Sequence, residues 1–238
     1  MDIHKPHAAK SWREFLIEIG TIVIGILIAL GLEQAIENYH ANQKTEEARQ
    51  AIAAELRFNI AKAKRVVEMR DCSERQLAAL ADAIGKGDRA EVRRQVDALR
   101  LPVPITWTDA AWRTALASDA SDRFSEQERR YAPVVYEVVN IINANQNRYV
   151  VSGGRLQVVA QSGLSNSGSA ESAELSDLAE MTSALRGMEG AAQSLVAFKV
   201  GNSVDLGEGR ADPIELPSPT QVADCKAAAG ALGPAAKS

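Results

Sequence analysis

Residues 15–36, FLIEIGTIVIGILIALGLEQAI, form the most apolar stretch of the chain. The centre of this stretch, residues 19–32, contains no charged side chain. A helix that crosses a bilayer needs about 20 apolar residues, whereas runs of roughly 10–14 also occur in soluble cores and signal peptides. The full stretch reaches the required length by including Glu18 and Glu33 near its ends, where a carboxylate can reach the headgroups. We therefore predict one membrane-spanning helix over residues 15–36.

The residues that flank the apolar stretch predict its orientation. The preceding tail, residues 1–14, carries Lys5, Lys10 and Arg13, and positive charge is retained on the cytoplasmic side of a membrane. We therefore expect a cytoplasmic tail and an extracytoplasmic domain from residue 37 onward. A cleavable signal peptide is the alternative, because Ala-Leu-Gly at residues 29–31 fits a small-residue cleavage site. Glu18 inside the stretch argues against cleavage.

Residues 18–37, EIGTIVIGILIALGLEQAIE, resemble the start of a family of uncharacterised bacterial single-span membrane proteins. These proteins open with Glu-Ile and an Ile/Val/Gly-rich span that ends in Ile-Ala-Leu. A second similarity consists of Ala111-Trp112, Ala115, Tyr131 and Tyr136. The resemblance implies an anchor in the bacterial inner membrane and a helical periplasmic domain, and it brings no activity or catalytic residues with it. The chain departs from the family pattern at Ser118-Asp119, where such proteins often have Ser-Gly.

The composition predicts a single helical domain beyond the anchor. The 238 residues suffice for about one sizeable core once the anchor and a tail are set aside. Apolar content that leans on alanine, with only 5% aromatic residues, favours helix over sheet. The net charge of -4 and the lack of a long basic run argue against nucleic acid as a partner. We expect an all-α fold, with a helical bundle over residues 37–203 and an irregular tail over residues 204–238.

The first helix of this bundle is predicted to continue directly out of the membrane. Residues 33–84 contain no proline or glycine, and Gly85 and Gly87 then end the helix. Apolar side chains recur at steps of three and four, as on one face of an amphipathic helix. They are Ala48, Ile52, Leu56, Ile60, Ala63, Val67, Leu77, Leu80 and Ile84. A break is expected near residues 71–73. A coiled-coil dimer is the alternative use of this face, but clean heptads are not sustained, which favours packing within the chain.

Capping signals place the later helices. Asp88 can cap a short helix that ends at Leu99. A further helix is predicted to begin at residue 106 or 108, with Trp107 and Trp112 as core anchors. Ser-Glu-Gln-Glu at residues 125–128 forms a capping box for the next helix. Pro133 is expected to kink that helix or to move its start to residue 132.

Apolar periodicity predicts which side chains of the last two long helices face the core. For the helix after residue 125 they are Tyr131, Val134, Val135, Val138, Ile141 and Ile142. For the helix from residue 172 to residue 200 they are Leu175, Leu178, Met181, Leu185, Met188, Ala192 and Leu195. Residues 149–161 fit either strands or an interrupted helix, and residues 162–169 are predicted to form a loop. A solvated helix face is expected from Glu171, Glu174, Asp177 and Glu180.

The sequence contains no recognisable catalytic, cofactor-binding or metal-binding motif. Its histidines, His4, His7 and His40, lie within or beside the anchor, so the body of the outer domain has none for general-base or zinc chemistry. Cys72 and Cys225 are the only cysteines, and outside the cytoplasm they are predicted to form a disulfide. Two unpaired buried thiols are the alternative.

One side of the membrane helix is predicted to dock against another helix. Six residues share this side at 3.6 residues per turn: Glu18, Thr21, Gly25, Ala29, Leu32 and Glu33. Small side chains four residues apart let helix backbones approach closely in lipid. Alternatively, glycine and alanine have no special role here and Glu18 extends to the headgroups.

Interaction surfaces, rather than reactive groups, therefore define the expected function. The expected partners are the lipid bilayer and either other membrane protein subunits or a second copy of the chain. We favour an accessory or assembly subunit of a membrane protein complex. The alternative is a membrane-tethered periplasmic enzyme or ligand sensor with a pocket between helices.

Overall fold

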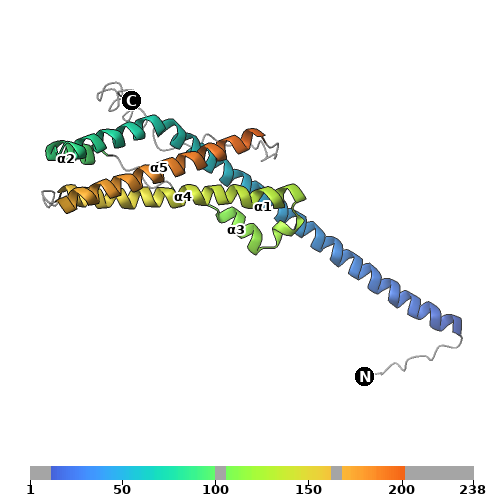
Figure 1. Ribbon diagram of the computed structural model, residues 1–238. Helices are drawn as coiled ribbons and strands as arrows, with labels where there is room; N and C mark the ends of the chain where they lie inside the picture. Colours follow the sequence, from blue (N-terminus) through green and yellow to red (C-terminus); the bar gives the residue numbers. More distant parts are fainter. Residues whose placement is uncertain (1–11, 100–105, 162–167, 202–238) are drawn as a thin grey trace. The chain divides into compact units, whose positions relative to one another are not determined.

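The computed structural model describes residues 12–99, 106–161 and 168–201, and every regular element in these ranges is helical (Figure 1). The elements are α1 (Trp12–Gly85), α2 (Arg89–Ala98), α3 (Ala110–Ala117), the 3-10 helix η1 (Ala120–Arg123), α4 (Glu126–Gln161) and α5 (Gly168–Gly201). The prediction of an all-α protein is confirmed. The chain divides into two compact units, Met1–Glu47 and Ala48–Ser238. The predicted tail, residues 204–238, lies outside the described residues, as does most of the predicted loop at residues 162–169.

α1 is a single helix of 74 residues, as the absence of proline and glycine after the anchor predicted. The break expected near residues 71–73 was a wrong prediction. Aspartate and serine are only moderately poorer helix formers than alanine, and α1 buries Val66 before this point and Leu77 after it. The helix ends at its glycines, where Gly87 adopts a left-handed φ of 67° that glycine takes without strain.

Within the second unit, the helices surround one hydrophobic core. α4 and α5 lie side by side over much of their length (Figure 1). The predicted apolar face of α1 contributes to this core as expected. The largest fully buried apolar side chains are Leu80, Ile84, Ile142, Leu156, Met181 and Leu195. Burying a side chain of this kind stabilises a fold by about 1.5–3 kcal/mol, so this core dominates the stability of the unit.

Asp88 caps α2 as predicted, since its side chain accepts a hydrogen bond from the Glu91 N–H at 3.0 Å. The next helix, α3, begins at Ala110, so the prediction of a start at residue 106 or 108 was wrong. Residues 106–109 instead have no regular secondary structure, and Trp107 is buried outside any helix. The reason is that side chains of α1 bind the backbone of these residues, as described below.

The predicted capping box starts α4. The Ser125 N–H donates to Glu128 Oε2 at 2.6 Å, and the Glu128 N–H donates to Ser125 Oγ at 3.2 Å. α4 then runs through Pro133, so the alternative start at residue 132 was wrong. Pro133 removes the hydrogen bond to the carbonyl of Arg129, and both residues are exposed, so water can hydrate that carbonyl.

The predicted buried face of α4 is confirmed at Val135 and Ile142 but not at two other positions. Val134 and Ile141 were expected in the core and are 54% and 42% exposed, whereas Tyr136 and Val139 are buried. Residues 149–161 continue α4 without interruption, so the strand alternative was wrong for them.

On α5, six of the seven predicted core residues are buried. Leu175 is the exception, at 43% exposed. It lies on the same turn as the buried Glu174, so this turn places a carboxylate in the interior where the apolar pattern predicted a leucine.

Candidate functional site

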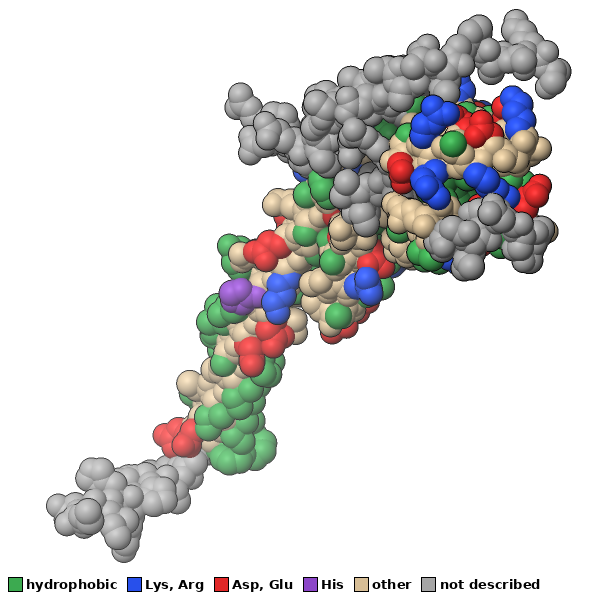
Figure 2. Space-filling view, turned by 90° about the vertical axis from the view of Figure 1, so that its left-hand side faces the viewer, with side chains coloured by type: hydrophobic (Ala, Val, Ile, Leu, Met, Phe, Trp, Pro, Cys, Tyr) green, Lys and Arg blue, Asp and Glu red, His purple; other side chains and the backbone are tan. Residues whose placement is uncertain are grey.

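The N-terminal part of α1 presents an uncovered apolar surface. α1 is the one helix in the described ranges that is long and apolar enough to cross a membrane, and none of its most apolar 18-residue window is buried. Figure 2 shows hydrophobic side chains along the surface of this part of the helix. An uncovered apolar helix of this length is typical of a membrane span and, near the N-terminus, also of a signal sequence.

The structure places all six residues of the predicted docking side on this helix. Glu18, Thr21, Gly25, Ala29, Leu32 and Glu33 are each exposed. The hydroxyl of Thr21 donates to the carbonyl of Ile17 at 2.8 Å, so it already has a partner within the helix. A methyl group built on Gly25 would meet no atom within 4 Å. The small residues therefore leave a free strip at the surface of the helix, as a close helix–helix contact requires.

In the second unit, a partly buried polar cluster joins α1 to α3 and α4. The carboxylate of Glu55 accepts hydrogen bonds from the Tyr136 hydroxyl at 2.7 Å, the Thr108 hydroxyl at 2.9 Å and the Ala111 N–H at 3.1 Å. Burial raises the pKa of Tyr136, and the bond to Glu55 raises it further. Tyr136 therefore stays protonated and serves as a fixed donor. Glu55 was not among the residues that the sequence singled out.

Two further α1 side chains bind the backbone of residues 106–109. The Asn59 amide donates to the carbonyl of Thr108 at 2.8 Å, and the ammonium group of Lys62 donates to the carbonyl of Thr106. The Lys62 nitrogen also lies 3.7 Å from the centre of the Phe58 ring, a cation–π contact. Burial lowers the pKa of Lys62 to about 8, an effect that the charge of Glu55 opposes. The sequence does contain a signal for this polar face of α1. It is the spacing of four and three residues between Glu55, Asn59 and Lys62.

The predicted tryptophan anchors are both used in packing. The Trp107 indole is buried and donates to the side-chain oxygen of Gln146 at 2.9 Å. Trp112 is half-buried and stacks on Tyr136, with ring centres 6.0 Å apart, and on Phe124 at 6.3 Å. Stacked pairs of this kind add about 0.5–1.5 kcal/mol beyond the area they bury. These rings form a structural joint rather than an aromatic cage around a ligand.

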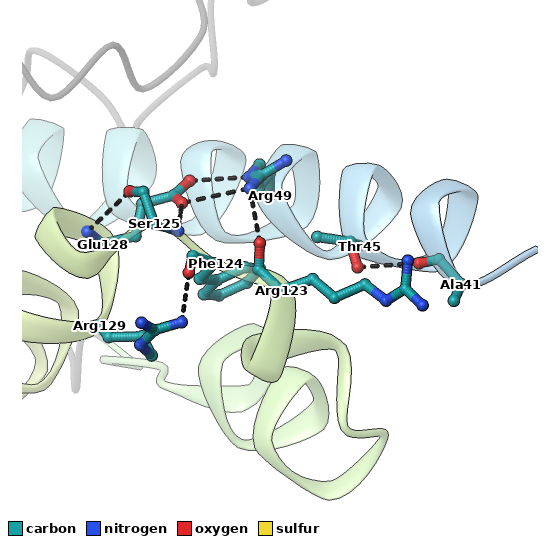
Figure 3. Close-up of polar contacts among 8 residues, drawn as sticks. All are labelled: Ala41, Thr45, Arg49, Arg123, Phe124, Ser125, Glu128 and Arg129. Carbon is teal, nitrogen blue, oxygen red and sulfur yellow. Dashed lines mark hydrogen bonds and ion pairs between the residues drawn. The ribbon is translucent and has the colours of Figure 1, made fainter. Parts of the chain in front are cut away.

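Arg49 ties α1 to the start of α4 (Figure 3). Its guanidinium group donates to Glu128 at 2.8 Å and to the carbonyl of Arg123 at 3.2 Å. It also lies 5.5 Å from the centre of the Phe124 ring. Burial alone would raise the pKa of Glu128, but the hydrogen bonds from Arg49 and Ser125 outweigh it and lower that pKa. Glu128 of the capping box is therefore bound both by Ser125 within the box and by Arg49 of α1.

The prediction of a solvated face for the carboxylates of α5 was wrong for Glu174 and Asp177, whereas Glu171 and Glu180 are partly exposed. Glu174 is fully buried and pairs with Arg89 of α2, and Asp177 is 9% exposed. Arg155 of α4 donates to Asp177 at 2.7 Å and to Glu180 at 2.6 Å. The arginine partners come from other helices, so the pattern within α5 alone could not reveal them.

The described residues contain no group of histidine, cysteine or acidic side chains that could hold a metal ion. His40 is exposed on α1, and His4 and His7 lie outside the part of the chain that the structure describes. The polar clusters described above consist of hydrogen bonds and ion pairs that join different helices. Such an arrangement positions the helices of the second unit relative to one another.

The predicted disulfide involves Cys72, which is 3% exposed beside Met69 on α1. Its predicted partner, Cys225, lies outside the described residues, so the disulfide stays a prediction. Closing a loop of this length would stabilise the fold by about 4–5 kcal/mol in the chain-entropy model. We expect non-reducing mass spectrometry of protein alkylated directly in cells to find no free thiol. Two alkylated cysteines would contradict both the bridge and the expected periplasmic location.

No family model, no curated protein and no solved structure matches the chain.

Proposed function

We propose that this protein is a membrane-anchored interaction protein, an accessory or assembly subunit of a complex in the bacterial inner membrane. The observation that carries the proposal is that one helix, α1, contains both an uncovered apolar segment and a face packed into the core of a folded unit. An anchor that continues into a folded unit without a loop is suited to presenting that unit at a membrane surface. The polar clusters of the unit support the same conclusion, because they join helices to one another.

The proposed topology has the N-terminus in the cytoplasm and the second unit in the periplasm. It rests on Lys5, Lys10 and Arg13 before the span. Alkaline phosphatase, which is active only in the periplasm, reports this directly when fused after residue 238. We expect high activity from that fusion and low activity from one placed before residue 1. The reverse pattern would refute the orientation, and a shortened mature chain that begins after residue 31 would show that the segment is a cleaved signal.

The proposed docking surface is the side of the span that carries Thr21, Gly25 and Ala29. In lipid, helices associate through close packing and hydrogen bonds, because lipid tails solvate aliphatic side chains as well as a protein does. Glu18 at the edge of this side supports the proposal, since a carboxyl group just inside the apolar layer is normally turned toward protein or headgroups.

The test is purification of tagged full-length protein from cross-linked membranes, followed by mass spectrometry of the proteins that accompany it. We expect a stoichiometric partner, or a second copy, that is lost when Gly25 and Ala29 are both changed to leucine. The matched control is the pair Ile24→Leu and Leu27→Ile, which changes shape on the lipid-facing side and should leave the complex intact. If the control disrupts the complex while the Gly25/Ala29 variant assembles normally, the docking side is wrong. A protein that purifies alone in every case would refute the interaction function and favour the enzyme or sensor alternative.

A further inference from the structure

Glu189 of α5 is a buried carboxylate without adequate partners. Glu189 is 4% exposed, and its Oε1 atom is buried without a hydrogen-bond partner. Its Oε2 atom lies 3.8 Å from Nε of Arg70 on α1, beyond hydrogen-bond distance. Buried charged groups in proteins are nearly always paired and hydrogen-bonded, because an unpaired charge loses its hydration without compensation. Glu174 on the same helix also has a buried Oε1 atom without a hydrogen-bond partner, but its Oε2 atom pairs closely with Arg89, whereas Glu189 has no such close pair.

The charges around Glu189 do not compensate for its burial. From α1, Arg70 faces it together with Glu74 and Asp71, and Arg70 is shared because its Nε also lies 3.6 Å from Glu74. From α5 itself, Arg186 contributes a weaker attraction. Burial first, and the charge of Glu74 second, raise the pKa of Glu189 to about 7.

From α4, the titratable group that faces Glu189 is the hydroxyl of Tyr149. Burial, with the charge of Glu189 as a smaller cause, raises the pKa of Tyr149 to about 12. Tyr149 therefore keeps its proton throughout the physiological range. Between Glu189 and Tyr149, only Glu189 changes its charge near neutral pH.

We propose that Glu189 makes the packing of α5 against α1 depend on pH, so that the contact is tight when Glu189 is protonated and loosened when it is ionised. Protonation removes the buried charge and its repulsion from Glu74 and Asp71. Ionisation restores both, in a stretch of α5 where the neighbouring side chains of Met188 and Ala192 are also buried. A contact of this kind responds to the pH of its surroundings without a ligand, as buried titratable groups do in other pH-sensitive proteins.

Linkage fixes the direction of the effect. An unfolded glutamate has a pKa of about 4.5, below that of the folded protein. Between these two values the folded state binds more protons than the unfolded state, so the stability of the contact falls as the pH rises through this interval. The contribution is fully present below about pH 4.5 and is lost above about pH 7. This inference concerns the second unit alone and does not depend on the proposed orientation in the membrane.

The test is hydrogen–deuterium exchange of the full-length protein in detergent micelles at pH 5.5, 6.5 and 8.0, corrected for the intrinsic exchange rate at each pH. We expect protection of peptides around residues 184–197 and 66–77 to fall about tenfold between the lowest and highest pH. In Glu189→Gln, which keeps the shape and removes the charge, protection should stay at the low-pH level throughout. The control Glu180→Gln neutralises a partly exposed carboxylate on the same helix and should retain the pH dependence of the wild type.

A second measurement does not depend on stability. Infrared spectroscopy detects the carbonyl band of a protonated carboxyl group, and we expect a band that disappears as the pH rises through about 7 and is missing in Glu189→Gln. A wild-type protein with constant protection and no such band would overturn the proposal. So would a pH dependence of the same size in Glu189→Gln, because it would assign the effect to another group.

Discussion

The change Tyr136→Phe tests the polar joint between α1, α3 and α4 by removing one oxygen atom. The Tyr136 hydroxyl donates to the Glu55 carboxylate at 2.7 Å, and its ring stacks on Trp112. Phenylalanine keeps the ring in place, so the stacking is preserved and only the hydrogen bond is lost. The experiment therefore isolates one bond to a charged acceptor.

The expected loss of stability follows from what remains bound to Glu55. A hydrogen bond to a charged group contributes about 1.5–3 kcal/mol. Glu55 still accepts from Thr108 and from the Ala111 N–H after the change, so its charge is not left without partners. We therefore expect Tyr136→Phe to lower the free energy of unfolding by about 1.5–2 kcal/mol, the lower part of that range. Glu55→Ala leaves three donors without their acceptor and should cost more, about 3 kcal/mol or above.

The assay is urea unfolding of the full-length protein in detergent, followed by the fluorescence of its tryptophans, because Trp107 and Trp112 both lie at this joint. Combining the two changes in a double-mutant cycle should give a coupling energy of about 1–2 kcal/mol between Tyr136 and Glu55. Tyr39→Phe is the control, since Tyr39 is 68% exposed, and it should change stability by less than about 0.5 kcal/mol. A coupling energy near zero would refute the assignment of the hydroxyl to Glu55, whatever the size of the single effects.

Three further predictions test packing, backbone approach and titration. Ile142→Ala should cost about 2–5 kcal/mol in urea unfolding because its side chain is fully buried, whereas Ile141→Ala should cost less than about 1 kcal/mol; equal losses would show that the face of α4 is misassigned. Gly187→Ala should stabilise α5 by less than Gly190→Ala, because the methyl carbon added at Gly187 would lie 2.7 Å from the side-chain oxygen of Asn145 on α4, which must move aside. Gly190→Ala meets open space and should stabilise the helix by about 0.5–1 kcal/mol, so equal gains at both sites would contradict the close approach. Because burial lowers the pKa of Lys62 to about 8, the unfolded chain binds more protons above that pH, and stability should rise between pH 8 and about pH 10; urea midpoints of Lys62→Met should lack this rise, and an unchanged rise would assign it elsewhere.

The sequence by itself determined the features that depend on neighbours along the chain. Hydrophobicity over a continuous stretch identified the apolar segment of α1, and the absence of proline and glycine after it predicted a helix that continues to Gly85. The capping box at Ser125 and Glu128 could be predicted from the sequence because its two hydrogen bonds join residues three apart. Each of these signals acts over one or two helical turns, where spacing along the chain equals proximity in space.

The tertiary structure decided how the helices are rotated and which polar groups are buried. The sequence of α4 allows either Val134 or Tyr136 to face the core. In the structure Tyr136 is buried and bonded to Glu55 on α1, whereas Val134 is exposed. Glu174 was predicted to lie on a solvated face of α5, yet it is buried, and so is Glu189. A charge enters the interior when another helix supplies a partner or imposes its burial, and that depends on contacts between residues far apart in the chain. Local periodicity contains no information on those contacts, so the polar joint at Glu55 and the unsatisfied carboxylate at Glu189 emerged only when the helices were packed together.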